Sequence, residues 1–254
     1  PKGLPYHNDC IAKHFLRFSD YYYGGRLPTD CGNWLEEILK WAPEKRMVAM
    51  TDLMGNQRVF KVELSEFDEE YYLVSFFDVT ESQLEKQHWQ YKASHDPLTG
   101  CYNREFLEMN LEVFMRFVRR EQSHAGLLLI DVDYFKTIND TFGHAEGDRV
   151  LSELANLIYR NVRDSDLLVR WGGEEFLLLM AVDSNDSLER IAKNLGRTVS
   201  ENLKSPGGPM TVSIGGAILN NESELEAALS RADAGLYYVK AHGRNGYLFV
   251  PEES

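Results

Sequence analysis

The chain has 254 residues and carries 27 Lys and Arg against 40 Asp and Glu, which gives a formal net charge of -13. This acidic balance argues against a general nucleic-acid binder or an anionic-membrane binder, because both need a basic face. The length suggests one large domain or two smaller ones, and 43% hydrophobic with 26% charged residues is typical of a soluble globular protein. An acidic protein that handled a polyphosphate would need metal ions or a few well-placed cations.

No apolar run approaches the roughly 20 residues that a membrane-spanning helix needs, and no secretory signal peptide is visible. Three widely spaced cysteines, Cys10, Cys31 and Cys101, form neither a disulfide framework nor a metal-binding pattern. These features predict a reduced, cytoplasmic protein with no membrane segment within this chain. The sequence starts at Pro1 and not at Met, which is consistent with a piece of a longer chain.

The first 80 residues predict a small domain that ends in an antiparallel sheet. An aromatic-rich stretch, Ile11–Tyr23, and a short segment, Asn33–Trp41, are expected to be helices separated by Gly and Pro. Apolar and polar residues alternate along Phe60–Ser65, as in a half-buried strand. Further strands are expected at Arg46–Thr51 and Tyr71–Asp78, which completes a three-stranded meander.

A polar stretch without Gly or Pro, Ser82–Ser94, predicts a connecting helix. Leu84, the pair Gln87 and His88, and Tyr91 leave a thin stripe that suits a short coiled coil, and an ordinary exposed helix fits the spacing equally well. The expected division of the chain is a small domain, a linker helix and a larger domain, at residues 1–80, 81–95 and 96–254.

The larger domain alternates helices and strands. Helical spacing of apolar residues predicts helices at Asn103–Arg120, Asp148–Val162, Ser187–Leu203 and Glu222–Ala241. Apolar runs predict strands at Gly126–Asp133, Leu167–Trp171, Glu174–Met180, Met210–Leu219 and Tyr247–Val250. Gly172 and Gly173 between two of these runs predict a tight β-hairpin. The pattern indicates an α/β (α+β) fold in which helices flank a mixed sheet.

Acidic residues stand where two of these strands begin or end. Asp131-Val132-Asp133 follows a buried strand, where carboxylates can hold a divalent cation or simply begin a solvated loop. Glu174 and Glu175 follow the hairpin glycines, which let backbone N–H groups approach a phosphate. In a strand these two glutamates would face opposite sides, so only one could join Asp131 on a metal. An exposed hairpin tip with solvated acids is the alternative.

Two further pairs suit a nucleotide. Asn139 and Asp148, within a loop or broken helix at 135–148, fit a guanine edge, because a carboxylate can accept from N1–H and the 2-amino group. Asp148 would also suit a helix N-cap. Lys240 and Arg244, four residues apart near the end of the last helix, could clamp phosphates or serve as ordinary partners of the helix dipole.

Together and in this order, these segments resemble the GGDEF domain, the catalytic domain of diguanylate cyclases, in a GGEEF variant. The resemblance covers roughly 160 residues from Asp96 onward. Cys101, Gly235 and Val239 depart from the residues usual in the family, and none of them touches the chemistry. The matching segments are DPLTGCYNR (96–104), DVDYFKTINDTFGHAEGDRVL (131–151), RWGGEEF (170–176), TVSIGGA (211–217) and ADAGLYYVKAHGRN (232–245).

The resemblance implies an enzyme that condenses two GTP into cyclic di-GMP and releases two pyrophosphates. Asp131, Glu174 and the backbone carbonyl of Val132 would hold Mg²⁺ or Mn²⁺, and Glu175 is a candidate base or second metal ligand. Lys136 would contact charge that develops on phosphate. The remaining implied substrate contacts are Asn139 and Asp148 to guanine, Phe135 in the pocket wall, Lys240 and Arg244 to the triphosphate, and Gly172 and Gly173 beside phosphate.

The resemblance also implies regulation. Arg163 and Asp166 match an inhibitory product site at a fixed distance before the hairpin, with Arg190 or Arg197 as an undecided second arginine. A cyclic product needs two active sites with one GTP each, so a two-fold homodimer is expected. The first domain, with Asp78-Val79-Thr80-Glu81 at its end, resembles a PAS-family sensor. The sequence identifies neither its ligand nor the direction of its control.

Two other functions stay open at this point. An inactive GGDEF fold could sense GTP or cyclic di-GMP, against which the intact Asp131, Glu174, Glu175 and Lys240 argue. A cyclase with a different base preference is the other, against which Asp148 argues. The net charge of -13 still excludes broad nucleic-acid binding, but it is compatible with a polyphosphate substrate if the acids recruit metal ions.

Overall fold

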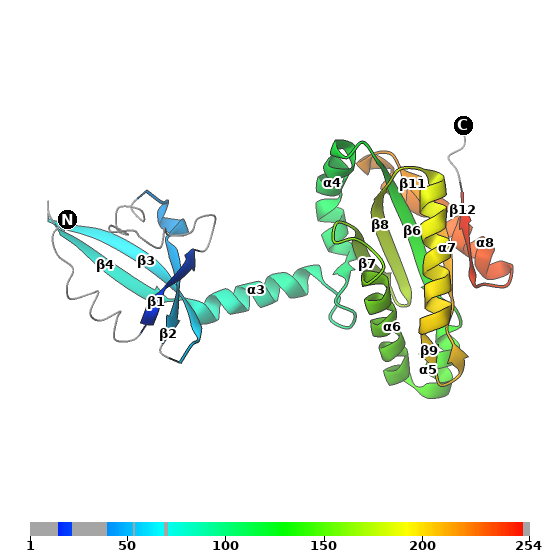
Figure 1. Ribbon diagram of the computed structural model, residues 1–254, viewed down its shortest axis with the longest axis horizontal. Coiled ribbons are helices and arrows are strands. Elements are labelled where there is room, and N and C mark those ends of the chain that lie inside the picture. The colour runs from blue at the N-terminus through cyan, green and yellow to red at the C-terminus, as the bar shows by residue number, and fades with distance from the viewer. Residues whose placement is uncertain (1–14, 22–39, 53, 69–70, 251–254) are drawn as a thin grey trace. The chain divides into compact units, whose positions relative to one another are not determined.

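The protein contains two compact units, Pro1–Gln90 and Tyr91–Ser254 (Figure 1). No helix among the residues that the structure describes is long and apolar enough to cross a membrane. The structure is a computed structural model, and the residues it describes are 15–21, 40–52, 54–68 and 71–250.

A four-stranded antiparallel sheet forms the first unit, with its strands in the order β1-β2-β3-β4. Val48, Phe60 and Val62 are buried, and the last two lie two residues apart on the same face of one strand. The predicted meander is therefore confirmed, with one more strand than expected. The strands are Phe15–Tyr21 (β1), Met47–Asp52 (β2), Gln57–Asp68 (β3) and Tyr71–Asp78 (β4), and a short 3₁₀ helix is Pro43–Lys45 (η1).

Strand β1 shows that the helix expected at Ile11–Tyr23 was wrong. Its backbone pairs antiparallel with β2, with Phe18 opposite Met50 and Ser19 opposite Ala49. Aromatic residues are common in strands, and pairing with a neighbouring strand overrides a weak helical preference. The helix expected at Asn33–Trp41 lies outside the described residues except for its last two, which are not helical.

A short junction ties the end of the first sheet to helix α3 (Thr80–Ser94). The hydroxyl of Thr80 accepts a hydrogen bond of 2.8 Å from the Val59 N–H, and the Val79 N–H donates to the Val59 carbonyl at 2.9 Å. None of the residues of α3 is buried, and the division between the two units falls within it. An isolated helix of this length is marginal in water, so α3 depends on its anchored ends.

A six-stranded mixed sheet lies at the centre of the second unit, with the order β12-β11-β6-β8-β7-β5. The outer pairs β11–β12 and β5–β7 are parallel, and the inner pairs are antiparallel. A separate hairpin joins Lys204–Ser205 (β9) to Gly208–Pro209 (β10). The strands of the sheet are Tyr102–Asn103 (β5), His124–Val132 (β6), Leu167–Gly172 (β7), Glu175–Val182 (β8), Val212–Leu219 (β11) and Gly246–Phe249 (β12).

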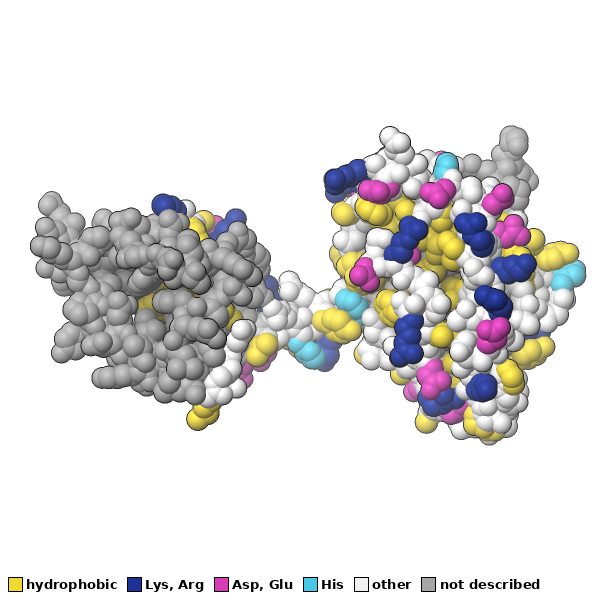
Figure 2. All heavy atoms as spheres, in the orientation of Figure 1, with side chains coloured by type: hydrophobic (Ala, Val, Ile, Leu, Met, Phe, Trp, Pro, Cys, Tyr) yellow, Lys and Arg dark blue, Asp and Glu magenta, His cyan; other side chains and the backbone are white. Residues whose placement is uncertain are grey.

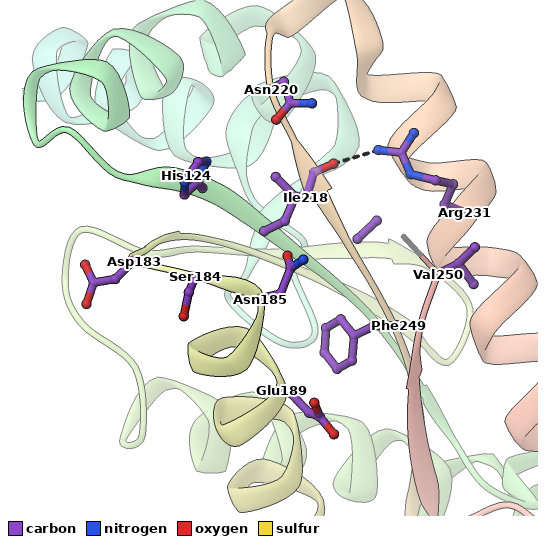
Figure 3. Close-up of a pocket in the computed structure, with 11 residues that line it drawn as sticks. His124, Asp183, Ser184, Asn185, Glu189, Ile218, Asn220, Arg231, Phe249 and Val250 are labelled. Carbon is purple, nitrogen blue, oxygen red and sulfur yellow. Dashed lines mark hydrogen bonds between the residues drawn. The ribbon is translucent and has the colours of Figure 1, made fainter. Parts of the chain in front are cut away.

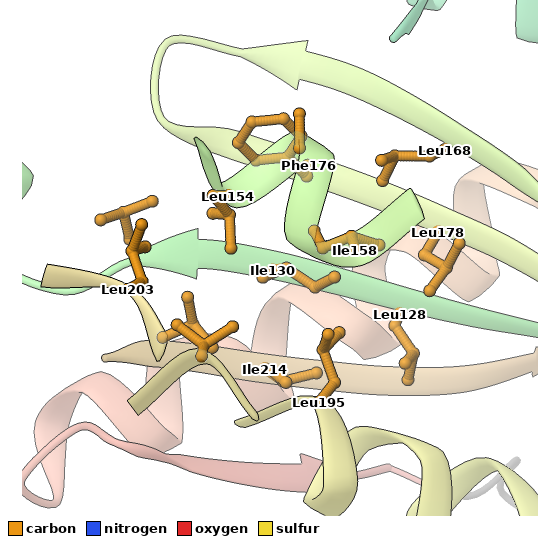
Figure 4. Packing of buried hydrophobic residues seen from close by; sticks show 14 of the residues in the cluster. Leu128, Ile130, Leu154, Ile158, Leu168, Phe176, Leu178, Leu195, Leu203 and Ile214 are labelled. Carbon is orange, nitrogen blue, oxygen red and sulfur yellow. The ribbon is translucent and has the colours of Figure 1, made fainter. Parts of the chain in front are cut away.

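Helices cover both faces of this sheet, as the sequence predicted. Strand β6 is buried on both sides, because Leu128 and Ile130 point into one core (Figure 4) and Leu127 and Leu129 into the other. The first core is shared with α6 and α7 and the second with α4 and α8. The helices are Arg104–Arg120 (α4), Phe135–Phe142 (α5), His144–Tyr159 (α6), Asn185–Asn202 (α7) and Leu225–Ala241 (α8), with the 3₁₀ turn Glu222–Glu224 (η2).

Helix α8 lies unusually close to the sheet. A Cβ atom at Gly215 in β11 would overlap the backbone of Ala232 and Leu236 in α8. A Cβ at Gly235 would come within 2.7 Å of the Leu248 carbonyl oxygen, so Gly fits here where alanine is the family's usual residue. These two glycines fix how α8 crosses the sheet, and with it the place where Lys240 emerges.

A stack of rings marks the beginning of the second unit. Tyr91 in the last turn of α3 and His95 just after the helix lie with ring centroids 4.1 Å apart, and His95 lies 4.6 Å from Tyr102. Tyr102 continues the stack to Phe106 in α4, at 3.9 Å. The last turn of α3 is therefore packed against the first strand and helix of this unit.

Candidate active site

Three carboxylates, here called the acid cluster, meet where β6 ends and β8 begins: Asp131, Glu174 and Glu175. Glu175 is the cross-strand partner of Asp131, and such partners point to the same face of a sheet. The strand was expected to begin at Glu174, but Glu174 lies in the hairpin turn and β8 begins at Glu175. Its carbonyl accepts from the Val132 N–H at 3.4 Å, which holds the turn beside the end of β6. The acid cluster thus combines residues that are more than 40 positions apart.

Lys240 of α8 reaches into the acid cluster, with its Nζ 2.7 Å from the Asp131 Oδ2. Burial, assisted by the charges of Glu174 and Glu175, raises the pKa of Asp131 to about 6, although the Lys240 contact acts in the opposite direction. Only 5% of Asp131 is exposed. The ionised acid cluster is therefore short of positive charge and suits an added cation.

The donor atoms fit a hard divalent cation. The carboxylates of Asp131 and Glu174 and the carbonyl of Val132 are oxygen ligands of the kind that Mg²⁺ and Mn²⁺ take. Across the described ranges, no three His, Cys, Asp or Glu side chains are already arranged around a metal position. Lys240 forms an ion pair with Asp131 where a metal ion would otherwise bind. Because the Lys240 side chain is 31% exposed, it can move to an incoming phosphate. That exchange would free Asp131 for a metal ion.

Arg170 braces the hairpin that carries the two glutamates. Its Nε and Nη2 donate to the Gly173 carbonyl at 3.2 and 2.9 Å, and its Nη1 donates to both oxygens of Asp96 at 2.9 and 3.0 Å. Asp96 also accepts from the backbone and hydroxyl of Thr99. One guanidinium group thus joins the start of the second unit to the hairpin tip, where Gly172 and Gly173 are exposed.

Helices α5 and α6 form the broken helix that was predicted beside β6. Phe135 is buried, Lys136 is exposed, and the Asn139 side chain lies so close to Gly147 that a Cβ there would overlap it. Asp148 is exposed and follows Gly147 directly. The Asn139 side chain thus lies against the residue that precedes Asp148. Asp148 is not an N-cap, however, because α6 begins four residues earlier, at His144.

Arg244 lies beyond the helix that carries Lys240, in agreement with the helix end expected at Ala241. Helix α8 ends at Ala241, and the chain then turns through Gly243, Arg244 and Asn245, all with positive φ. The guanidinium carbon of Arg244 lies 4.6 Å from the centre of the Tyr134 ring. Lys240 and Arg244 therefore approach the end of β6 from two different elements.

Asp133 has a role that the sequence did not reveal. It is 2% exposed, and its Oδ1 accepts a hydrogen bond of 2.6 Å from the Ser213 hydroxyl. Its Oδ2 accepts from the Thr211 hydroxyl at 2.6 Å and from the Asn245 N–H at 3.0 Å. The aspartate considered as a possible metal ligand is thus bound by three neutral donors. Only the arrangement of β11 and the turn after α8 shows this.

Comparison with known proteins places this geometry in a family. Residues 93–246 match the model described as "Diguanylate cyclase, GGDEF domain". The chain belongs to the GGDEF family. Response regulator PleD of Caulobacter vibrioides is 40% identical over 165 residues, which are 60% of this chain and 35% of PleD. Diguanylate cyclase DgcM of Escherichia coli is 37% identical over 172 residues, which are 67% of this chain and 42% of DgcM. The chain therefore spans less than half the length of these relatives.

Solved GGDEF structures confirm the predicted fold of the second unit. The coiled coil and GGDEF domain of DgcB from Caulobacter crescentus, in complex with c-di-GMP, has a TM-score of 0.61 at 27% identity and covers 68% of this chain and 93% of that one. The GGDEF domain of PA1120 from Pseudomonas aeruginosa has a TM-score of 0.55 at 34% identity and covers 61% of this chain and 93% of that one. Both likenesses concern the GGDEF unit.

A second candidate site in this GGDEF unit lies between the end of α6 and α7. A cavity of about 280 Å³ there is lined by Arg163, Asp166 and Arg190, whereas Arg197 is not among its lining residues. Burial raises the pKa of Asp166, although its carboxylate accepts a hydrogen bond of 2.9 Å from the Arg163 N–H.

On the face of this unit shown in Figure 2, Lys and Arg side chains are interspersed with acids. The net negative charge thus conceals local cations.

Another cavity lies away from the acid cluster (Figure 3). It encloses about 460 Å³ at the opposite end of the sheet, where His124 begins β6 and Asp183 follows β8. Arg231 lines it and donates to the Ile218 carbonyl at 2.7 Å. None of the predicted site residues lines this cavity.

Proposed function

We propose that this chain is a diguanylate cyclase that condenses two GTP molecules into cyclic di-GMP. The observation that carries the proposal is the acid cluster at the end of β6 with Lys240 against it, on a fold of the GGDEF family. Lys240 marks where a triphosphate would bind, and the acids mark where its metal ion would bind.

The reaction consists of two equivalent transfers. The 3′-hydroxyl oxygen of one GTP attacks the α-phosphorus of the other, a P–O bond forms, and the bond to the β-phosphate bridging oxygen breaks, which releases pyrophosphate. The hydroxyl proton passes to a base, for which Glu175 of the acid cluster is the candidate. A second transfer in the opposite direction closes the ring and releases the second pyrophosphate.

Mg²⁺ or Mn²⁺, held by Asp131, Glu174 and the Val132 carbonyl, would reduce the repulsion between the attacking oxygen and the phosphate. Lys240, released from Asp131, would bind a phosphate oxygen. The other proposed substrate contacts are Lys136, Arg244 and the backbone at Gly172 and Gly173 with phosphates, and Asn139, Asp148 and Phe135 with guanine.

The cyclisation requires two copies of the chain, because each active site would hold one GTP. We infer a two-fold homodimer in which the acid clusters face each other. Helix α3 contains the division between the two units and has no buried residues, which suits a regulatory connection. The first unit is proposed to be a PAS-like sensor of an unidentified signal, since its antiparallel sheet leads into α3 through the hydrogen-bonded Thr80.

Incubation with GTP and Mg²⁺, followed by detection of cyclic di-GMP and pyrophosphate, tests the proposal. Glu174→Gln should abolish turnover, while Glu108→Gln, a change of an exposed acid on α4, should not. If GTP binds but no pyrophosphate forms with Mg²⁺ or Mn²⁺ at high protein concentration, the chain is a nucleotide-binding module instead. Incorporation of adenine from a mixture of ATP and GTP would overturn the assignment of Asp148 to guanine.

The cavity at Arg163 and Asp166 is proposed to bind the product and inhibit the enzyme, with Arg190 as the second arginine because it lines the same cavity. Arg163→Ala should leave the initial rate intact and remove the plateau that accumulating product causes. Arg190→Ala should weaken inhibition and Arg197→Ala should not. A plateau that is unchanged in Arg163→Ala would disprove this inhibitory site.

A further inference from the structure

Three residues with left-handed backbone geometry lie beside the proposed phosphate site. They are Tyr134 (φ 56°), Arg244 (φ 63°) and Asn245 (φ 48°). Asparagine adopts this conformation readily, but it is costly for Tyr134 and Arg244, and such residues persist only where the surrounding structure enforces them. Strained backbone of this kind is concentrated at functional sites.

Asp133 holds the turn that contains Arg244 and Asn245. Its Oδ2 accepts the Asn245 N–H at 3.0 Å, directly after Arg244 in the chain. The Arg244 N–H in turn donates to the Val239 carbonyl at 2.9 Å, so the turn is fastened at both sides. Asp133 itself is held by the hydroxyls of Thr211 and Ser213, both at 2.6 Å, from the segment that begins β11.

The fastened turn determines where the Arg244 guanidinium lies. The Tyr134 ring lies under it at 4.6 Å, and Tyr134 is the residue that follows Asp133. Asp133 therefore fixes the arginine through the backbone turn, and the residue beside it in the chain contacts the guanidinium. Loss of the Asp133 carboxylate would release the turn while leaving Arg244 in the chain.

We propose that Asp133 is a positioning residue for substrate: it sets the turn that aims Arg244 at the phosphates of the bound nucleotide. This inference rests on the proposed function, because it assumes that Arg244 contacts GTP. It assigns to Asp133 a role distinct from that of Asp131, although the two aspartates are separated by one residue. The carboxylate does not touch substrate and acts through the Asn245 N–H.

Asp133→Ala should raise the KM for GTP by roughly tenfold to a hundredfold, the range expected for losing a charge-assisted contact, with a much smaller change in kcat. Asp133→Asn should restore a KM close to that of the unaltered protein. Its carbonyl oxygen can still accept from Asn245 and Thr211, and its amide can donate to the Ser213 hydroxyl. Ser213→Ala is the matched control, because it removes a bond to Oδ1 and leaves the bond to Asn245. It should lower stability without raising the KM.

A double-mutant cycle with Arg244→Ala separates positioning from a merely structural role. If Asp133 acts through Arg244, the double variant should have the same KM as Arg244→Ala alone. Calorimetric titration with GTPαS and Mg²⁺ provides the same comparison without turnover. Additive effects of the two substitutions, or an equal rise in KM for Ser213→Ala, would overturn the inference. If Asp133→Ala does not fold, Asp133→Ser takes its place in the cycle, since serine is too short to reach the Asn245 N–H.

The outcomes also separate this inference from the proposed function. If the unaltered protein makes no cyclic di-GMP and binds no GTPαS, the proposed function fails. If it turns over GTP normally while the cycle is additive, only the role of Asp133 fails.

Discussion

Asp131 and Asp133 stand one residue apart at the end of the same strand, and both are at least 95% buried, yet their surroundings are opposite. Asp131 faces two further carboxylates and one lysine, and its pKa is raised to about 6 by burial and by those acids. Asp133 accepts three hydrogen bonds from uncharged donors. The first arrangement costs stability and suits chemistry, and the second stabilises the fold.

The difference shows that burial alone does not identify the reactive carboxylate. What distinguishes the two aspartates is whether hydrogen bonds or like charges surround them. A carboxylate that accepts three hydrogen bonds is already stabilised without a metal ion, whereas the acid cluster is stabilised when a cation binds. Four substitutions test this contrast.

Asp131→Asn should have the largest effect, a loss of cyclic di-GMP synthesis by roughly a thousandfold or more, because a metal ligand at the reacting phosphate is removed. The same change removes the cost of burying this charge, together with the smaller repulsion from Glu174 and Glu175, so the free energy of unfolding without metal should rise by about 1 kcal/mol. Rate assays and urea unfolding without metal ions would measure both. A less stable variant would show that the ion pair with Lys240 outweighs the cost of burying the Asp131 carboxylate.

Asp133→Ala should change stability in the opposite direction from Asp131→Asn. It leaves the Ser213 and Thr211 hydroxyls and the Asn245 N–H without their acceptor, which should lower the free energy of unfolding by roughly 2–4 kcal/mol. Urea unfolding of this variant beside Asp131→Ala is the direct comparison. Equal losses in the two variants would show that the two carboxylates do not differ in their contribution to the fold.

Arg170→Lys should weaken the support of the acid cluster without touching it. An ammonium group cannot bind Asp96 through two bonds and also reach the Gly173 carbonyl, so we expect kcat to fall roughly tenfold and stability by about 1–2 kcal/mol. Arg116→Lys is the matched control, since Arg116 forms an exposed ion pair with Glu112 on α4. Similar losses in both variants would mean that the hairpin does not depend on Arg170.

Asp96→Asn should give the smallest change, seen only in the pH dependence of stability. Burial raises the pKa of Asp96, but hydrogen bonds from Thr99 and Arg170 outweigh it and hold the pKa below its ordinary value. Ionised Asp96 therefore stabilises the fold above its ordinary pKa near 3.9, and this contribution is lost as the pH falls through the lower folded pKa.

The expected loss is below about 1 kcal/mol, because the pair is partly exposed. Urea unfolding from about pH 7 to pH 3 should show a shallower acid decline in Asp96→Asn, while exposed Asp164→Asn should retain the full decline. Identical curves for all three proteins would exclude this contribution.

The sequence predicted much of the GGDEF unit because its local patterns agree with its fold. Strand β6 reads as an apolar run since both its faces are buried, and the paired glycines mark the hairpin between β7 and β8. Helices α4 and α7 have a clear apolar stripe and were placed within one or two residues. Asn139 and Asp148 lie on two consecutive helices that are separated by Gly143 alone, and their pairing on guanine stays a prediction.

What the sequence could not predict depends on contacts between distant segments. Phe15–Tyr21 fits a helix or a strand until β2 pairs with it. The helix end at Ala241 was predicted, but the four-residue spacing of Lys240 and Arg244 does not reveal the turn with positive φ values that carries Arg244. Asp133 resembles a metal ligand until Thr211, Ser213 and Asn245 are found around it. In each case the deciding feature is either a contact with a residue more than 25 positions away or a local backbone conformation.

The bracing of the hairpin by Arg170 has a consequence for engineering chimaeras. Because Asp96 and the Gly173 carbonyl share one guanidinium, a fusion joint placed after Asp96 would remove part of the support of the catalytic hairpin. The stack from Tyr91 through His95 to Tyr102 extends the required segment back into α3. A foreign input domain should therefore be joined before Tyr91, where exchange of the upstream chain leaves every one of these contacts in place.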